Sequence, residues 1–308
     1  MTEAADNQRC GFFAILGAPN VGKSTLINRL VGAKVSIVSP KVQTTRARVL
    51  GIAVEGGAQL VFIDTPGIFK PRRRLDRAMV AAAWGGAADG DLVLLLVDSQ
   101  SGIDADTRRI IEGLAERRSA TPASPDVILV LNKIDIVKKP RLLTLAAELA
   151  AKGIFSETFM ISAKDGCGVD DLRSFLAGRA PPGPWHFPED QLSDMPQRLL
   201  AAEITREKLY LQLRQELPYA ATVETETWEE KKDGSVKISQ IIYVERSSQK
   251  GIVLGEKGAR IKSIGEESRK ELAEIFERVV HLFLFVKVRE GWGDDPDRYR
   301  DWGLDFNA

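Results

Sequence analysis

The sequence predicts an α/β protein of two domains, a larger one with a mixed, mainly parallel sheet and a smaller α+β domain. Three observations lead to this fold class. From Gly11 to about Ala180, short and nearly continuous apolar runs alternate with helical patterns, a proline-rich stretch follows, and the rest of the chain combines amphipathic helices with alternating strands. The expected boundaries are 1–180 for the first domain, 181–196 for a linker and 197–308 for the second domain.

The strands of the first domain are predicted from four apolar runs, F-F-A-I-L, L-V-F-I-D, L-V-L-L-L-V-D and V-I-L-V-L-N. Their hydrophobicity is nearly continuous, as is typical of parallel strands that are buried on both faces of a sheet. Ahead of the second run, V-L-G-I-A-V-E and a G-G turn predict an antiparallel hairpin partner. Together with the intervening helical patterns, these runs indicate a three-layer α/β domain.

The second domain follows a linker whose prolines forbid a regular helix or a central strand. Its expected order begins with a helix at 197–216 and two strands joined across K-K-D-G-S. A short helix, a glycine loop, a helix at 259–279 and a last strand, H-L-F-L-F-V-K-V, complete it. This part of the chain therefore predicts an α+β domain.

Composition gives no sign of an anionic partner, because Lys and Arg number 43 and Asp and Glu also number 43. Such a partner must be bound by a local patch. The opening residues M-T-E-A-A-D-N-Q lack the basic start and apolar run of a secretory signal, and no apolar run approaches the ~18 residues of a membrane span. We therefore expect a cytoplasmic protein whose two cysteines stay reduced.

The first glycine-rich loop, G-A-P-N-V-G-K-S, lies between the strand F-F-A-I-L and the helix T-L-I-N-R-L-V. That is the context of a P-loop, in which backbone N–H groups surround phosphates, Lys23 reaches the β- and γ-phosphate oxygens and Ser24 holds Mg²⁺. The predicted nucleotide-binding residues of this loop are Gly17, Ala18, Pro19, Asn20, Val21, Gly22, Lys23, Ser24 and Thr25.

The choice of base is predicted by N-K-I-D, which follows the strand V-I-L-V-L. The Asp135 carboxylate can accept hydrogen bonds from N1 and the exocyclic amine of guanine, whereas adenine would leave it unpaired. We expect Asn132 to brace the loop and the Lys133 stem to lie along the ring. S-A-K follows the next predicted strand, and its backbone N–H groups can cover the base oxygen; its residues are Ser162, Ala163 and Lys164.

Two further motifs are expected to sense the γ-phosphate. D-T-P-G ends the strand L-V-F-I, which places Asp64 near the magnesium shell and the Gly67 N–H near the γ-phosphate; Thr65 and Pro66 complete the motif. Q-T-T-R, at 43–46, offers Thr44 or Thr45 as the hydroxyl that reaches Mg²⁺, and the sequence leaves both open. The predicted catalytic residues are Lys23, Thr45 and Gly67, and the predicted metal ligands are Ser24, Thr45 and Asp64.

A second glycine loop, G-E-K-G, lies between two predicted helices of the second domain. Two glycines separated by two residues let the backbone approach a sugar-phosphate chain, which is how a KH module grips about four nucleotides of single strand. The element order matches the type II KH arrangement, and nearby cations supply local positive charge. The predicted RNA-binding residues are Gly255, Glu256, Lys257, Gly258, Arg260 and Lys262.

The four nucleotide motifs, in this order, resemble the translation-factor class of GTPases. T-T-R before the hairpin, G-A-R-I-K-S-I-G, the D-G-S turn after Trp228 and the ending V-K-V-R-E-G-W-G-D-D resemble the Era family over almost the whole chain. The resemblance implies a P-loop GTPase domain joined to a type II KH domain, a switch that binds GTP, GDP and Mg²⁺ and hydrolyses GTP slowly. Its implied partner is the single-stranded 3′ end of small-subunit ribosomal RNA, with a role in small-subunit assembly. We expect a monomer.

Some positions depart from the expected pattern. Ile68 stands where a Ras-type switch has its water-orienting glutamine, so another group must orient water. The run R-R-R at 72–74 offers no assignable arginine finger and is interpreted as a solvated face. Related GTPases with an asparagine at the position of Asn20 can use K⁺ beside the phosphates. Glu256 would repel phosphate, so Lys257 is expected to make the contact.

Two alternative functions stay open. Beside the RNA-binding switch, the first alternative is an RNA-binding scaffold whose nucleotide is structural, and the second is a GTPase of cell-cycle or membrane-associated signalling. In the second case the C-terminal domain binds protein or lipid, and the protein lies peripherally at the inner membrane. The absence of a lipidation motif and the mixing of Lys and Arg with Glu near 251–270 favour RNA over lipid.

Overall fold

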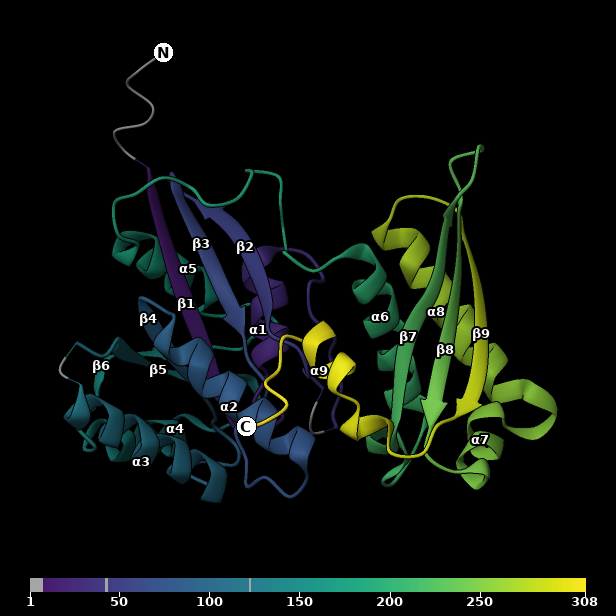
Figure 1. Ribbon diagram of the computed structural model, residues 1–308. Coiled ribbons are helices and arrows are strands. Elements are labelled where there is room, and N and C mark those ends of the chain that lie inside the picture. Colours follow the sequence, from purple (N-terminus) through teal and green to yellow (C-terminus); the bar gives the residue numbers. More distant parts are fainter. Residues whose placement is uncertain (1–7, 42–43, 122) are drawn as a thin grey trace, which may run out of the picture. The chain divides into compact units, whose positions relative to one another are not determined.

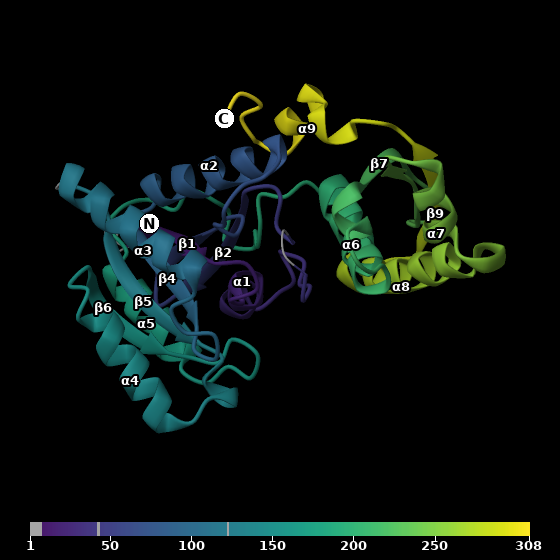
Figure 2. The same ribbon diagram turned by 90° about the horizontal axis from the view of Figure 1, so that it is seen from below.

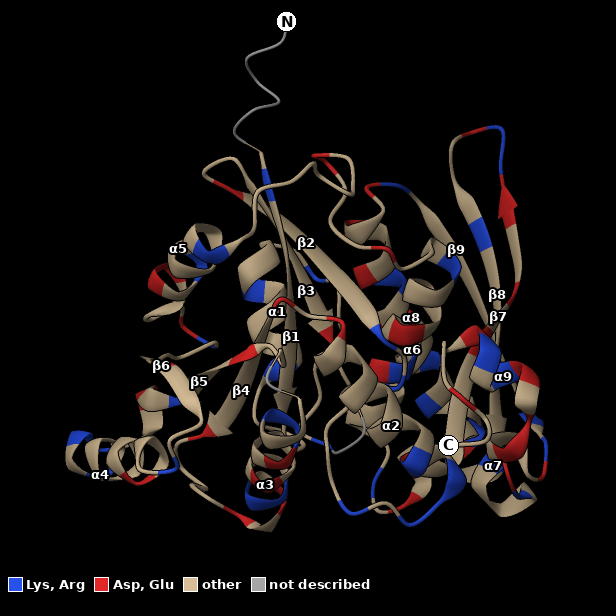
Figure 3. Ribbon diagram, turned by 60° about the vertical axis from the view of Figure 1, so that its left-hand side comes forward, with Lys and Arg blue, Asp and Glu red and all other residues tan. Residues whose placement is uncertain are grey.

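The computed structural model describes residues 8–41, 44–121 and 123–308 (Figure 1). The chain forms two compact units. The first unit contains the residues up to Ser36, then Thr45–Asp194, and also Tyr299–Ala308; the second contains Ile37–Thr44 and Met195–Arg298. Acidic and basic residues are interspersed over both units (Figure 3), in keeping with their equal numbers.

The first unit is built on a six-stranded sheet of order β2-β3-β1-β4-β5-β6. Its strands are β1 (Arg9–Gly17), β2 (Val49–Glu55), β3 (Ala58–Asp64), β4 (Leu92–Asp98), β5 (Asp126–Asn132) and β6 (Phe155–Met160). β2 pairs antiparallel with β3, and all other neighbours are parallel. The mixed, mainly parallel sheet and the hairpin expected from the sequence are confirmed.

Helices cover both faces of this sheet. They are α1 (Lys23–Val31), α2 (Arg74–Ala88), α3 (Ala105–Ala120), α4 (Lys139–Ala150) and α5 (Val169–Arg179). Gly51 of β2 lies against Ile27 of α1, and it pairs with Phe62 of the neighbouring strand β3. Ile63 follows Phe62 in β3, so its side chain points to the opposite face of the sheet, where it lies against Gly86 of α2. Because the carboxyl ends of parallel strands share one edge, the loops that follow β1, β3, β5 and β6 meet there.

The second unit has the KH element order. It contains α6 (Gln197–Gln212), β7 (Ala221–Glu230), β8 (Val236–Val244), α7 (Ser247–Leu254), α8 (Ala259–Ile275) and β9 (Val280–Val288). β8 lies between β7, to which it is antiparallel, and β9, to which it is parallel. α6 and α8 pack against each other and against the sheet (Figure 2). Both helices are about four residues shorter than expected, ending at Gln212 and Ile275.

The proline-rich stretch is not a free linker. Up to Asp194 it runs along the first unit, where the Ile52 N–H donates to the Leu192 carbonyl over 2.9 Å and the Leu50 N–H donates to Asp194 Oδ1 over 2.8 Å. Ser193 forms an antiparallel bridge with Gly51. β2 is an edge strand, and this segment satisfies backbone groups that an open edge would expose.

The C-terminal residues Tyr299–Ala308 also belong to the first unit rather than to the expected 197–308 domain. This segment starts within α9 (Pro296–Asp301) and continues beyond the end of that helix. Buried Tyr299 and Leu304 pack against the apolar side of α2, which includes Met79. All three arginines of the run 72–74 are exposed, as a solvated face requires, and Arg74 in addition stacks over the Phe306 ring at 4.3 Å.

Candidate functional site

The P-loop connects β1 to α1 and is shaped by two glycines. A Cβ at Gly17 would lie 2.6 Å from the Leu96 carbonyl oxygen. Gly22 has φ of +101°, in the left-handed region, and a Cβ there would lie 2.4 Å from Asn132 Nδ2. The loop therefore needs glycine at both positions, because a side chain would meet neighbouring atoms below normal contact distance.

Lys23 is buried at the start of α1. Its ammonium group donates hydrogen bonds to the carbonyls of Gly17 and Ala18, each over 3.1 Å, and so lies inside the curve of the loop. Burial lowers the pKa of Lys23 to about 8, although the Asp64 carboxylate acts in the opposite direction. A buried cation of this kind is stabilised by an anion held by the same loop.

A cluster of oxygens lies around Asp64, at the end of β3. Its Oδ2 accepts hydrogen bonds from the hydroxyls of Ser36 (2.6 Å), Thr45 (3.2 Å) and Ser24 (3.3 Å). Its Oδ1 is buried and has no hydrogen-bond partner among the described residues. Burial raises the pKa of Asp64, while Ser36 and Lys23 counteract this. A carboxylate with one unpaired buried oxygen beside three hydroxyls fits a hard divalent cation such as Mg²⁺.

The two candidate threonines have different surroundings. The Thr45 hydroxyl lies 3.1 Å from Ser24 Oγ, inside the Asp64 cluster. The Thr44 hydroxyl instead donates to the Lys41 carbonyl over 2.8 Å. The structure thus places Thr45, and not Thr44, beside the predicted metal ligands. Gln43, the first residue of the motif, lies outside the described residues.

The D-T-P-G motif passes close to the P-loop. A Cβ at Gly67 would lie 3.1 Å from the Pro19 Cα, and the Ile68 N–H donates to the Gly17 carbonyl over 3.2 Å. Thr65 donates to the Ile15 carbonyl over 2.6 Å. Ile68 is buried in the hydrophobic core, so its side chain takes no part in a polar site.

The base-recognition motif is tied to both neighbouring loops by one side chain. Asn132 Nδ2 donates to the Val21 carbonyl over 2.8 Å, and its Oδ1 accepts from the Ala163 N–H over 2.9 Å. Lys133 adopts a left-handed conformation with φ of 65°, and its ammonium group donates to the Asn20 carbonyl over 2.8 Å. The Asp135 carboxylate is exposed, and no hydrogen bond joins it to the described part of the chain.

Three residues that sequence reasoning missed support these loops. Ser36 donates the shortest hydrogen bond to Asp64, and Asp98 forms an ion pair of 2.7 Å with Lys133. Arg29 of α1 donates to the carbonyls of Ala163 and Lys164, the latter over 2.5 Å. Only Asp98 carried a signal, because it ends an apolar strand at the same sheet edge as the other motifs.

The second glycine loop joins α7 to α8 through residues with positive φ. Gly255, Lys257 and Gly258 all have positive φ, of 73°, 49° and 79°. A Cβ at Gly255 would lie 2.7 Å from the Arg260 Cβ, whereas one at Gly258 would meet nothing within 4 Å. Lys257 is exposed, together with Glu256. This geometry leaves the Gly258 side of the loop open to a close backbone partner.

The cations near this loop differ in their availability. The Arg260 guanidinium donates to the Ile252 carbonyl of α7 and braces the loop, so the expectation that it contacts RNA gains no support from its placement. Lys262 is exposed and borders a groove of about 580 Å³ between α8 and β9. The groove is lined by Ile261, Lys262, Gly265, Glu266, Arg269, Leu282, Phe283 and Leu284. A partly apolar groove with cations at its border suits unstacked bases.

Comparisons with known proteins agree with this arrangement. Residues 12–133 match the family model of a 50S ribosome-binding GTPase, and residues 216–293 match that of a KH domain. GTPase Era of Rhizobium meliloti (strain 1021) is 63% identical over 298 residues, which cover 97% of this chain and 93% of the relative. GTPase Era of Brucella suis biovar 1 (strain 1330) is 60% identical over 305 residues, or 99% and 96% of the two chains.

The chain belongs to the Era family of GTPases. Two crystal structures of Era align with a TM-score of 0.89 and cover 96% of this chain and 99% of their own. One is a point variant of Aquifex aeolicus Era bound to GDP and AlF₄⁻, at 39% identity. The other is Era in complex with MgGDPNP and nucleotides 1506–1542 of 16S ribosomal RNA, at 38% identity. The Era fold expected from the resemblance is thereby confirmed. In the described ranges, no helix is long and apolar enough to cross a membrane.

Proposed function

We propose that this member of the Era family binds and hydrolyses GTP, and that it binds the single-stranded 3′ end of small-subunit ribosomal RNA during assembly of the small subunit. One observation carries the proposal. A complete set of P-loop GTPase motifs and an open KH loop occur in one chain that aligns over nearly its full length with Era bound to MgGDPNP and 16S ribosomal RNA.

Nucleotide binding is assigned to the loops at the carboxyl edge of the first unit's sheet. The backbone N–H groups from Ala18 to Ser24 and the Lys23 ammonium group hold the phosphates. Asp135 selects guanine, because adenine would leave its carboxylate unpaired. Asn132 links the base loop to the P-loop through Val21, so that both ends of the nucleotide are held by one rigid frame.

Ser24, Thr45 and Asp64 are the proposed magnesium ligands or their close partners, because they form the oxygen cluster around the unpaired Asp64 Oδ1. Magnesium supplies charge neutralisation at the phosphate oxygens. The Gly67 N–H meets the γ-phosphate, and Lys23 balances charge as the terminal bond breaks. No side chain at position 68 orients the attacking water, which is consistent with slow turnover.

RNA binding is assigned to the second unit. The Gly255–Gly258 loop approaches the sugar-phosphate chain, Lys257 contacts a phosphate, and the α8–β9 groove takes the bases. Lys262, at the border of that groove, adds positive charge next to the backbone of the strand.

Binding of a short RNA with the small-subunit 3′ sequence tests this proposal. The protein is loaded with GDP or with a non-hydrolysable GTP analogue, and Lys257→Asp is compared with Lys232→Asp, an exposed lysine of the β7–β8 turn. We expect Lys257→Asp to abolish binding and Lys232→Asp to leave it close to that of the parent. RNA binding that survives Lys257→Asp, or is absent from the parent in both nucleotide forms, would remove the assignment.

Three expectations remain predictions. Use of K⁺ beside Asn20 predicts faster GTP hydrolysis in potassium than in sodium at equal ionic strength, and equal rates would refute this hypothesis. A monomer is expected in sedimentation equilibrium. Peripheral membrane association predicts co-sedimentation with anionic liposomes, whereas the RNA assignment requires none.

A further inference from the structure

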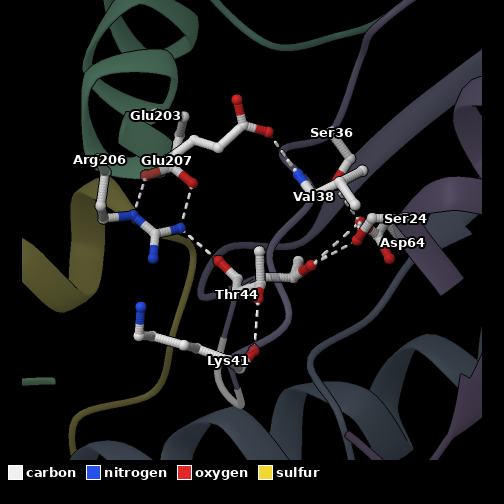
Figure 4. Close-up of polar contacts among 10 residues, drawn as sticks. Ser24, Ser36, Val38, Lys41, Thr44, Asp64, Glu203, Arg206 and Glu207 are labelled. Atoms are coloured by element: carbon white, nitrogen blue, oxygen red, sulfur yellow. Dashed lines mark hydrogen bonds and ion pairs between the residues drawn. The ribbon is translucent and has the colours of Figure 1, made fainter. Parts of the chain in front are cut away.

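The segment Ile37–Thr44 belongs by its contacts to the second unit, although it lies in the sequence between two parts of the nucleotide-binding unit. Ile37 is buried in an apolar cluster with residues of α6, β8, α8 and β9. The Val38 N–H donates to Glu207 Oε1 of α6 over 2.7 Å. At the other end of the segment, the Thr44 carbonyl accepts a hydrogen bond from Arg206 Nη2 of α6 (Figure 4).

Arg206 is held firmly in this position. Its side chain is 1% exposed, its Nε donates to Glu203 Oε1 over 2.7 Å, and Nη2 also contacts Glu203 Oε2. The guanidinium carbon lies 5.1 Å from the centre of the Tyr210 ring. A planar guanidinium bound at two nitrogens by a carboxylate has little freedom to rotate, so the second N–H of Nη2, which meets the Thr44 carbonyl, has a fixed direction.

The hydrogen bond to Thr44 has a geometric consequence for the next residue. The carbonyl of Thr44 and the N–H of Thr45 lie in one rigid peptide plane, so a donor that fixes the carbonyl also fixes the direction in which the chain enters Thr45. Thr45 is buried, and its hydroxyl lies within 3.2 Å of Asp64 Oδ2 and 3.1 Å of Ser24 Oγ. One peptide bond thus separates a carbonyl held by α6 from a hydroxyl at the magnesium cluster.

We propose that Arg206, braced by Glu203, is a positioning residue that orients the Thr44–Thr45 peptide plane so that the Thr45 hydroxyl reaches the magnesium shell of bound GTP. This inference rests on the proposed GTPase function. It assigns a helix of the RNA-binding unit a part in nucleotide recognition. Because Thr45 is expected at the metal only when the γ-phosphate is present, Arg206 favours the GTP form over the GDP form.

The test uses the full chain and measures affinity for GDP and for a non-hydrolysable GTP analogue in the presence of Mg²⁺, together with kcat and KM for GTP. In Arg206→Met we expect GDP affinity to stay within about twofold, and analogue affinity and kcat to fall roughly tenfold or more, the scale of a hydrogen bond to a charged group. Arg206→Lys keeps the charge and one donor, and should restore part of the loss.

Two comparisons separate positioning from a general structural effect. Arg198→Met, on the same helix, removes a guanidinium that donates to the carbonyls of Thr225 and Glu226, and it should leave both nucleotide affinities unchanged. In a Thr45→Val background, Arg206→Met should cause no further loss of analogue affinity, because its effect passes through Thr45.

An Arg206→Met protein with the parental ratio of analogue to GDP affinity would overturn the proposal, and so would an equal loss in Arg198→Met. If Arg206→Met fails to fold, Glu203→Gln weakens the brace while leaving Arg206 in place, and a parental ratio in that variant would also overturn it. A parent chain that bound neither nucleotide would instead refute the proposed function.

Discussion

Lys23 makes nucleotide affinity depend on pH in a way that can be worked out from its burial. Its ammonium group is enclosed by the P-loop, and burial lowers its pKa to about 8 from the ordinary value of 10.5. Bound phosphates favour the charged form and raise this pKa again. Nucleotide binding above pH 8 must therefore be accompanied by uptake of a proton, and affinity must fall as the pH rises.

The size of the effect follows from the pKa. With a free-state pKa of about 8 and a bound-state pKa well above it, affinity for GDP falls about tenfold between pH 7 and pH 9, or about 1.4 kcal/mol. At pH 8.5, binding takes up about 0.8 of a proton. Titration calorimetry in two buffers with different ionisation enthalpies measures that uptake directly, and fluorescence titration at several pH values gives the affinity.

Lys23→Met is the matched control, since methionine is similar in length and does not titrate. The affinity of this variant for GDP is expected to be weaker, and its pH dependence lacks the contribution of Lys23. Any fall in affinity with pH that remains belongs to the nucleotide or to other groups. A parent protein with constant GDP affinity from pH 7 to pH 9, or an equal fall in Lys23→Met, would refute the reasoning. The same shift predicts that the nucleotide-free protein becomes more stable as pH rises from about 8 to 10.5, because the unfolded chain binds the extra proton there.

Three substitutions probe the frame around the sites. Asn132→Ala removes the hydrogen-bond partners of the Val21 carbonyl and the Ala163 N–H. It should lower the free energy of unfolding by about 1–3 kcal/mol, measured by chemical denaturation, and weaken GDP binding, measured by titration. Unchanged stability would contradict the role of this side chain. Gly255→Ala places a Cβ 2.7 Å from the Arg260 Cβ at a φ of 73°, so RNA affinity should drop while GDP affinity does not, and equal RNA affinity in a binding assay would count against the loop. Tyr299→Ala removes a buried ring that packs against α2 and should lower the free energy of unfolding by roughly 3 kcal/mol. An unchanged calorimetric transition of the first unit would contradict this packing.

The sequence was informative where chemistry depends on short spacings. The P-loop, N-K-I-D and D-T-P-G are each contiguous, and each follows a strand whose apolar run is visible, so their shared position at one sheet edge followed from parallel topology. The hairpin β2–β3 and the KH element order were equally accessible, because alternation and turn residues are local signals.

Features that depend on contacts between distant residues were not accessible in this way. The surroundings of Thr44 and Thr45 differ through contacts with Lys41 for the first and with Asp64 and Ser24 for the second, and nothing in T-T itself distinguishes the two. Arg206 lies on an amphipathic helix where a charged residue is ordinary, and only its burial reveals a second role. The proline-rich stretch was correctly excluded from helices, but its backbone pairing with β2 leaves no trace in its own composition.

The C-terminal segment has a consequence for how the chain folds during synthesis. α2 emerges from the ribosome long before Tyr299–Ala308, with more than two hundred residues between Met79 and Tyr299. Until Tyr299–Ala308 appears, the apolar side of α2 that this segment covers faces solvent or a chaperone. The nucleotide-binding unit therefore cannot complete its packing before Tyr299–Ala308 has been made, and a chain truncated ahead of Tyr299 would expose an apolar helix face.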